Sequence, residues 1–375
     1  MYRPTIKSRI WLVITAIIFY FLFYWVENSI ETIQTDDYDR KVQAAELMLS
    51  ALDALQAYRL PGTNSELGNI ESDRLSFIIL GDKYSPITTD EGRMTDKLTV
   101  LNPNFAAVIV DYYNELNLNP GDTVAVMLSG SMPGANIAAL AAIKILDLHP
   151  IIITSVGASW WGANNPDFTW LDMERVLSEG DILPFRSTAA TAGGSDDQGG
   201  LRLSSLGRQL IIEAVNRNEA VYISQGTLMA NIKGRIRTYE HLTPISHYKA
   251  IINVGGGIAA IGHAENRQLI PAGVSLKLPE KNYPNHGVIH YFTDENVPLV
   301  HISDISIIAS KYNLPEGQLE LPEIGIGSVY HERRYNLKNA WIALVIMVVL
   351  MAAAKYFDKK HYQWREEKQD PDAIL

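Results

Sequence analysis

The stretch GDTVAVMLSGSMPGANIAALAAIKILDLHPIIITS, residues 121–155, decides the fold of this chain. It holds an apolar strand at 123–128, a turn of small residues, an alanine-rich helix that ends at Leu148, and a second apolar strand at 151–154. Two successive strands joined by a helix of this length lie parallel, and the connection is right-handed. Residues 121–155 therefore predict a βαβ unit.

The same alternation of strand and helix surrounds this unit. A helix is expected from Pro103, with Asn102 as its N-cap, and later helices are expected to be capped by Thr227 and Ser303. Further strands are predicted at 220–224, 250–254 and 298–302. Strands that alternate with helices favour an α/β fold with a doubly wound, mostly parallel (Rossmann-like) sheet covered on both faces. We expect this α/β domain to occupy residues 103–330.

Two hydrophobic segments flank the domain. Residues 10–26 hold a single threonine among apolar and aromatic side chains, and residues 340–354 are entirely apolar. The second segment extends to residue 357 if Lys355 reaches towards the lipid headgroups. Segments of this kind are typical of transmembrane helices, so we expect one at 10–26 and one at 340–357. A buried core helix is the alternative for the second segment.

The charges around these segments predict how the chain crosses the membrane. Basic residues precede the first segment and acidic residues follow it, which places residues 1–9 in the cytoplasm. No small-residue cleavage site follows, so an uncleaved anchor is expected rather than a removed signal peptide. Residues 358–375 would return to the cytoplasm, and the α/β domain would lie on the extracytoplasmic side of the cell membrane.

Two connecting regions separate the first anchor from the α/β domain. Residues 27–60 form a juxtamembrane region, with a helix expected from Asp37 to Leu60 because small and apolar residues recur there at helical spacing. This helix could be a stalk, a dimer seam, or a helix docked on the main domain. Residues 61–102 are interpreted as an irregular connection that includes a short strand at 75–80.

The charge and the cysteine content narrow the class of protein. The chain carries 32 basic and 42 acidic residues, a formal net charge of −10, which does not suit binding to nucleic acid. It contains no cysteine, so disulfides and thiol chemistry are excluded. This composition fits an extracytoplasmic bacterial protein that does not depend on oxidative folding.

Several predicted strands end in small or polar turn residues. In a parallel sheet these ends share one edge, where glycine lets backbone N–H groups approach a ligand and helix N-termini favour phosphate or carboxylate. We therefore expect an anion-binding crevice at that edge. Its candidate ligand-binding residues are Ser129, Gly130, Ser131, Ser155, Gly157, Gln225, Gly226, Gly255, Gly256 and Gly257. The alternative is that strand-to-helix turns need glycine, and helix caps need serine, in any fold of this kind.

A serine nucleophile is a second interpretation of the same edge. Ser129 or Ser131 could act with His301 as general base and Asp304 nearby, since all four follow predicted strands or end them. The simpler explanation makes Asp304 a helix N-terminal acid and His301 a hydrogen-bonded residue at a strand end. No established catalytic, dinucleotide or phosphate-loop fingerprint occurs, so the sequence leaves open whether the protein is an enzyme and which cofactor it uses.

A cationic patch is expected on the helix that follows Thr227. Lys233 and Arg237 lie four residues apart there, with Arg235 and His241 close by. This patch could receive the carboxylates of an acidic polymer or peptide. A solvated helix face is the alternative.

Residues 155–200 interrupt the alternation of strands and helices. They hold three of the seven tryptophans and a glycine-rich run at 193–200, which we interpret as a mobile loop or lid. No metal site is expected, because the histidines do not fall at metal-ligand spacing on a predicted helix.

Two segments, GDTVAVMLSGSMPGAN at 121–136 and SVGASWWGAN at 155–164, together with the terminal hydrophobic segments, resemble the bacterial family called poly-gamma-glutamate system protein. The resemblance implies an accessory role in the synthesis or export of poly-γ-glutamate, a secreted or capsular polymer. It further implies membrane subunits of the synthase or exporter as partners, besides the lipid bilayer, and an anionic glutamyl group as ligand. The alternative is a membrane-anchored hydrolase or transferase that acts on γ-glutamyl chains with a serine nucleophile. The family supplies no catalytic residues.

Overall fold

The computed structural model describes residues 9–59 and 79–368 and divides the chain into two units. The globular unit is Thr35–Tyr330, and the terminal unit combines the chain up to Gln34 with the chain from His331 onward. Three expectations lie outside the described residues: those for residues 1–8, for the end of the cytoplasmic tail from 369, and for most of the strand expected at 75–80.

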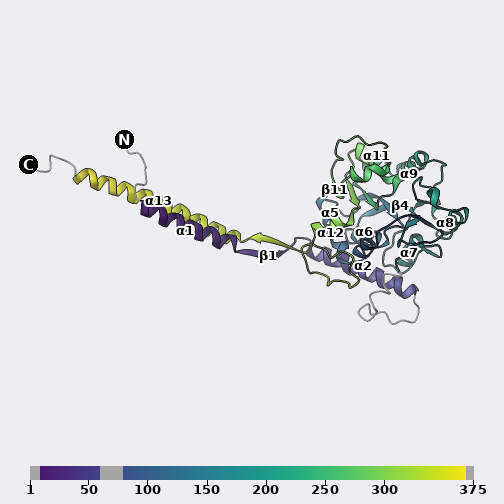
Figure 1. The fold of residues 1–375 in the computed structure, drawn as a ribbon, viewed down its shortest axis with the longest axis horizontal. Helices are drawn as coiled ribbons and strands as arrows, with labels where there is room; N and C mark the ends of the chain where they lie inside the picture. Colours follow the sequence, from purple (N-terminus) through teal and green to yellow (C-terminus); the bar gives the residue numbers. More distant parts are fainter. Residues whose placement is uncertain (1–8, 60–78, 369–375) are drawn as a thin grey trace, which may run out of the picture. The chain divides into compact units, whose positions relative to one another are not determined.

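A seven-stranded sheet forms the centre of the globular unit (Figure 1), in the order β11-β12-β10-β3-β4-β8-β9. The strands are β3 (Thr123–Ser129), β4 (His149–Ser155), β8 (Ala189–Thr191), β9 (Val221–Tyr222), β10 (Ala250–Val254), β11 (Gly273–Ser275) and β12 (Leu299–Ile302). Neighbouring strands in it are parallel, except that β11 runs antiparallel to β12. The mixed α/β class and the mostly parallel sheet are therefore confirmed.

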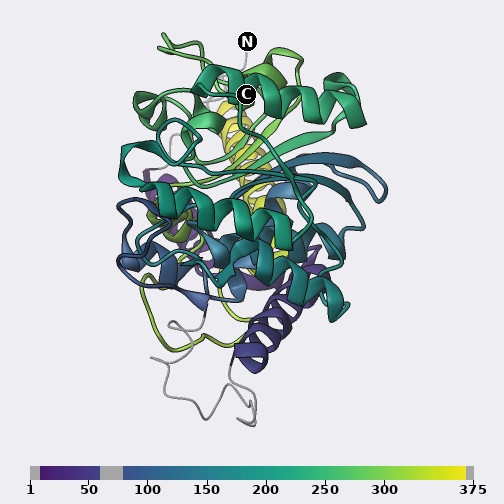
Figure 2. The same ribbon diagram turned by 90° about the vertical axis from the view of Figure 1, so that its right-hand side faces the viewer.

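Alternate side chains of the sheet enter different cores. In β3, Val124 and Val126 face one core, whereas Ala125 and Met127 face another. Helices cover both faces (Figure 2). The first core is packed by α2 (Tyr38–Arg59), α5 (Asn104–Glu115), α6 (Pro133–Ile145), α7 (Trp170–Glu179) and α12 (Ile305–Lys311). The opposite face is packed by α8 (Ser205–Arg217), α9 (Leu228–Leu242), α10 (Ile258–Ile261) and α11 (Val288–Asp294).

Of the three caps expected from the sequence, one is found at the expected residue. Pro103, not Asn102, occupies the cap position of α5, although the Asn102 side chain accepts a hydrogen bond from the backbone of Asn104 at 2.9 Å. The Thr227 side chain accepts from the backbone of Ala230 in the first turn of α9. The expectation for Ser303 is wrong, because Asp304, with φ of +47°, occupies the cap position of α12.

Helix α2 belongs to the globular unit. Its Met48, Leu52 and Leu55 are fully buried in the same core as α5 and α6. The ammonium group of Lys41, itself buried, donates to Asp111 Oδ1 at 2.8 Å and to the carbonyl oxygen of Val329 at 2.9 Å. Of the roles open for the juxtamembrane helix, docking on the main domain is the one observed.

Residues 155–200, which interrupt the predicted alternation of strands and helices, contain regular structure that the sequence did not predict. Helix α7 begins with a capping box in which the Thr169 backbone and hydroxyl both donate to Asp172. Strand β8 lies inside the sheet between β4 and β9. Short strand pairs join β2 (Thr88–Asp90) to β5 (Ala158–Ser159) and β6 (Asn164–Asn165) to β7 (Phe168–Thr169). A three-residue strand is too short to show periodicity, so sequence gave no signal for β8.

The terminal unit consists of two helices and a two-stranded ribbon. Helices α1 (Arg9–Glu27) and α13 (Leu337–Lys368) contact each other, and β1 (Ile30–Gln34) pairs antiparallel with β13 (His331–Tyr335). Within α13, residues Leu337–Phe357 are long and apolar enough to cross a membrane. In α1 the apolar stretch Val13–Glu27 is shorter than that. Among the described residues, one candidate span is thus found, at the C-terminal position.

Candidate functional site

A crevice lies where the strand order reverses. The chain builds β3, β4, β8 and β9 outward in one direction, then returns to place β10 on the other side of β3. The turns that leave β3 and β10 therefore diverge, and in open parallel sheets ligands bind at such a point. A cavity of about 390 Å³ occupies this position. Its lining includes most of the expected site residues: Ser129, Ser131, Ser155, Gly157, Gly255, Gly256, Gly257, His301 and Asp304.

Glycine is required at two of these turns. A side chain at Gly130 would place its Cβ 2.5 Å from the carbonyl oxygen of Val156, so Gly130 packs under the crevice instead of lining it. Gly255 has φ of +85°, and a Cβ there would lie 3.6 Å from Cβ of Ser129. Gly130 is therefore required by the close approach of the turn after β4, and Gly255 by its left-handed backbone conformation.

The remaining expected residues lie away from the cavity. Gln225 and Gly226 follow β9, which is the edge strand and is separated from β3 by β4 and β8. Lys233 and Arg237 are exposed on α9 and do not line the cavity. The expectation of one crevice shared by all of these strand ends was too broad, because a sheet of seven strands spreads its ends apart.

His301 is held as a neutral side chain. It is 1% exposed, and its Nδ1 accepts a hydrogen bond from the Asn253 amide at 2.9 Å, which leaves the proton on Nε2. Burial lowers the pKa of His301 to about 4. In the described part of the chain, no hydrogen bond joins His301 to Ser129, Ser131 or Asp304. The expected triad therefore lacks both its nucleophile–base contact and a carboxylate that orients the imidazole.

A buried lysine contacts a serine hydroxyl in this crevice, and no sequence pattern predicted that contact. Helix α4 (Met94–Thr99) carries Lys97, which is 3% exposed. Its ammonium nitrogen lies 2.8 Å from Ser159 Oγ, donates to the carbonyl oxygen of Ser131, and lies 3.3 Å from Met132 Sδ. Burial lowers the pKa of Lys97 to about 8. Both Lys97 and Ser159 line the cavity.

Ser159 is fixed by backbone contacts on two sides. Strand β5 pairs in parallel with β2, so Ser159 lies opposite Asp90. The Ser159 backbone N–H donates to Ser131 Oγ at 2.9 Å, and the Ser131 backbone N–H donates to Ser129 Oγ at 3.2 Å. The turn after β3 and the segment around Ser159 are thereby joined into one rigid wall of the crevice.

The mouth of the crevice carries charges of both signs. Arg267 approaches Asp90 to 3.8 Å, and Arg93 approaches Asp96 to 3.7 Å, in weak and partly exposed ion pairs. Asp304 and Glu91 also line the cavity. The crevice expected from the sequence was purely anion-binding, whereas the observed lining offers guanidinium groups and carboxylates side by side.

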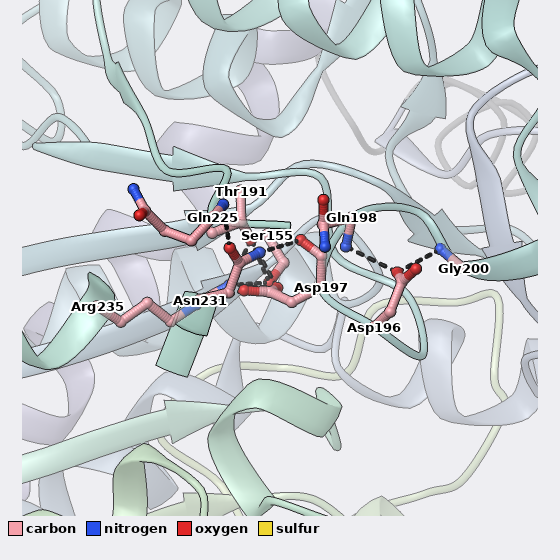
Figure 3. A network of polar contacts seen from close by, with 9 residues as sticks. All are labelled: Ser155, Thr191, Asp196, Asp197, Gln198, Gly200, Gln225, Asn231 and Arg235. Atoms are coloured by element: carbon pink, nitrogen blue, oxygen red, sulfur yellow. Dashed lines mark hydrogen bonds and ion pairs between the residues drawn. The ribbon is translucent and has the colours of Figure 1, made fainter. Parts of the chain in front are cut away.

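A buried ion pair fixes the glycine-rich run beside the crevice (Figure 3). Arg235 and Asp197 are each 2% exposed at their side chains, and Arg235 donates to both carboxylate oxygens, at 2.9 and 2.8 Å. Arg235 also donates to Ser155 Oγ at 2.8 Å, and Thr191 Oγ1 donates to Asp197 at 2.7 Å. Arg235 therefore faces the sheet and takes no part in the expected cationic patch.

Further hydrogen bonds hold residues 193–200, which the sequence predicts to be a mobile loop or lid. The Asn231 amide donates to the Asp197 carbonyl at 2.9 Å, and Asp196 accepts from the backbones of Gln198 and Gly200 at 2.8 and 2.6 Å. The Arg208 guanidinium donates to the Gly200 carbonyl at 2.8 Å. Residues 193–197 thus form a hydrogen-bonded wall of the cavity, lined by Gly193, Gly194, Ser195 and Asp197.

Comparisons with known proteins do not assign the chain to a family. No protein-family model, no curated protein and no solved structure matches it. Within the described residues, no group of three or more histidine, aspartate or glutamate side chains is arranged to hold a metal ion. The chemistry of the crevice therefore has to be argued from its own side chains.

Proposed function

We propose that this protein is a membrane-anchored accessory protein of poly-γ-glutamate synthesis or export, and that its crevice binds a glutamyl group of the polymer. The observation that carries the proposal is the cavity at the carboxyl ends of β3 and β10, with Arg93 and Arg267 at its mouth. The identity of the polymer rests on the sequence resemblance of residues 121–136 and 155–164.

The charges of the crevice suit one end of the polymer. A terminal glutamyl residue presents carboxylates together with an amine or amide N–H, and the lining pairs Arg93 and Arg267 with Asp90 and Asp96. Guanidinium groups match carboxylates, and the aspartates match the nitrogen. A cavity of about 390 Å³ suits a small ligand, so we propose that it holds one or a few residues.

We further propose that both terminal helices span the cell membrane and that the globular unit is a doubly wound, Rossmann-like domain on the extracytoplasmic side. The antiparallel pairing of β1 with β13 supports two adjacent spans that run in opposite directions, with both termini in the cytoplasm. Side chains of both helices are exposed and apolar, among them Ile17, Phe21, Val345 and Val349. Such surfaces suit contact with lipid and with membrane subunits of a synthase or exporter.

Deletion of the protein tests the biological role. We expect a changed amount or chain length of poly-γ-glutamate, and unchanged polymer in both respects would overturn the role.

Binding tests the crevice directly. The full-length protein in detergent is titrated with a γ-linked glutamate trimer, with an α-linked trimer as comparison. We expect Arg267→Ala to weaken binding of the γ-linked trimer by about 3- to 10-fold, because it removes one partly exposed guanidinium. Lys233→Ala, which removes an exposed cation remote from the cavity, is the matched control and should leave the affinity unchanged. Equal loss in both variants would place binding outside the crevice.

A further inference from the structure

We infer that Ser159 and Lys97 form a nucleophile and general-base pair, and that the crevice cleaves an amide or ester bond. The substrate class, a γ-glutamyl amide, rests on the proposed function, whereas the pair itself rests on the geometry alone. Four observations carry the inference.

The first is the direct contact. Lys97 Nζ lies 2.8 Å from Ser159 Oγ, within the range over which a base takes a proton from a nucleophile. Both side chains are buried in the protein yet line the cavity, so a ligand there can reach the hydroxyl. Serine–lysine pairs are a known variant of the serine–histidine arrangement.

The second is the surroundings of Lys97. The Lys97 ammonium contacts one hydroxyl, one carbonyl oxygen and one thioether. Among the described residues, no carboxylate lies close enough to form an ion pair with it. Burial disfavours the charged ammonium more than the nearby Asp96 carboxylate favours it, and so lowers the pKa of Lys97 to about 8. About one tenth of Lys97 is then a neutral amine at pH 7, and about half near pH 8, which is the form that a general base requires.

The third observation distinguishes Ser159 from Ser129 and Ser131, two other serines that line the crevice. Ser131 Oγ is engaged as the acceptor for the Ser159 backbone, and Ser129 Oγ is engaged by the backbone of Ser131. Lys97 reaches Ser131 through its carbonyl oxygen, not through its hydroxyl. Ser159 is therefore the hydroxyl that faces a base, while Ser131 is a positioning residue.

The fourth is the close approach of Gly92. A Cβ at Gly92 would lie 2.9 Å from Ser159 Oγ and 3.3 Å from Lys97 Cε. The pair thus lies directly against a backbone segment that lines the cavity and carries no side chain there. Only glycine leaves room beside the hydroxyl.

The reaction balances with these groups and water. The Lys97 amine takes the hydroxyl proton as Ser159 Oγ bonds to the carbonyl carbon, and the carbonyl electron pair moves to oxygen. Collapse of this tetrahedral species re-forms the carbonyl and breaks the bond to nitrogen, and the Lys97 ammonium protonates the leaving amine. Water, deprotonated by Lys97, then attacks the Ser159 ester and releases a carboxylic acid and the free hydroxyl.

The test measures release of nitroaniline from γ-glutamyl-p-nitroanilide, and of nitrophenol from p-nitrophenyl acetate, by full-length protein in detergent. We expect Ser159→Ala and Lys97→Met to lower both rates by at least about 100-fold. Ser310→Ala removes an exposed hydroxyl on α12 that does not line the cavity, and should leave the rates unchanged. The rate should rise with pH and level off above a midpoint near 8, and brief treatment with p-nitrophenyl acetate should acetylate Ser159, as seen by mass spectrometry.

Two outcomes overturn the inference. One is absence of turnover of either probe by the wild-type protein, and the other is full activity in Ser159→Ala. Lys97→Arg separates catalysis from structure: it should fold, as judged by thermal melting, yet stay inactive because arginine does not give up its proton. The glutamyl trimer should still bind to Ser159→Ala, so trimer binding without turnover rejects the nucleophile and leaves the proposed function intact.

Discussion

Glu174 is an ionisable residue that is buried in the globular unit. Its side chain is 2% exposed and accepts hydrogen bonds from Trp170 Nε1 at 2.6 Å and from the backbone and hydroxyl of Ser187, both at 2.8 Å. These donors favour the carboxylate, but burial outweighs them and raises the pKa of Glu174 from 4.5 to about 7. The folded protein therefore retains a proton on Glu174 that the unfolded chain releases.

This shift predicts how stability depends on pH. Between pH 4.5 and about 7 the folded state binds more protons at Glu174, so the free energy of unfolding falls as the pH rises through this range. Above the folded-state pKa of Glu174, the free energy of unfolding is lower than at pH 4.5 by on the order of 3 kcal/mol. In Glu174→Gln this slope should disappear, as measured by denaturant unfolding at a series of pH values.

The difference in unfolding free energy between the wild-type protein and Glu174→Gln, measured at each pH, isolates the contribution of Glu174. Burial lowers the pKa of His301 and His290 to about 4, so their contribution is lost as the pH falls below 6.5, which is the opposite sign. Both histidines are present in wild type and variant alike and cancel in the comparison. Parallel pH profiles for the two proteins would show that Glu174 ionises normally.

Residues at strand ends could be placed from the sequence, whereas residues outside the regular pattern could not. Ser129, Gly255 and His301 meet at one edge because parallel strands dictate it. Lys97 reaches Ser159 only through the folded path of residues 79–102, which shows no periodicity in the sequence. Helical spacing grouped Arg235 with its charged neighbours on α9, yet it cannot tell which face turns towards the sheet, and Arg235 is buried.

At the scale of elements, helix α6 packs directly against the backbone of the segment that follows α4. A Cβ at Gly134, in the first turn of α6, would lie 2.5 Å from the carbonyl oxygen and 2.8 Å from the carbonyl carbon of Val100. Both are backbone atoms that cannot turn aside. The helix that follows β3 is therefore packed onto the backbone that continues from Lys97, and it fixes α4 next to the crevice.

Gly134→Ala tests this contact through the sign of its effect. In a free helix the change would stabilise by up to about 1 kcal/mol, because alanine is the better helix former. The clash predicts a loss of about 1–3 kcal/mol instead, as measured by denaturant unfolding. Gly257→Ala is the control, since its Cβ meets nothing within 4 Å. A stabilised Gly134→Ala variant would contradict the packing of α6.

Long helices and strands were predicted from the sequence more accurately than short ones. Strand β10, expected at 250–254, is found with those bounds, and β3 and β4 each extend beyond their expected ends. Strand β8 and helix α7 were missed, because a buried three-residue strand and a helix inside a tryptophan-rich segment give no clear period. The N-terminal apolar helix could not be established as a span, since its described apolar stretch is short.

At the scale of the whole molecule, the globular unit has a complete core of its own. Helix α2 closes that core, because Met48, Leu52 and Leu55 contribute fully buried side chains to the cluster that also holds α5 and α6. We expect a protein of residues 35–330 to be soluble without detergent and to melt in one cooperative transition, as measured by circular dichroism.

A fragment of residues 61–330 is the matched control. It lacks α2 and exposes the apolar surface that α2 covers, so it should aggregate or lose its cooperative transition. If both fragments melted alike, the docking of α2 would contribute nothing to the stability of the globular unit.

The ribbon of β1 and β13 has a consequence for the unfolded chain. The globular unit begins and ends at adjacent points, where the Thr35 backbone donates to the Tyr330 carbonyl at 2.9 Å. While the ribbon stays paired, unfolding of the globular unit yields a closed loop of chain instead of two free ends. Loop closure of this length lowers the entropy of the unfolded state by the equivalent of roughly 6 kcal/mol at 25 °C in the chain-entropy treatment of cross-links. The paired ribbon would thus act on folding in the way a disulfide does, in a chain that contains no cysteine.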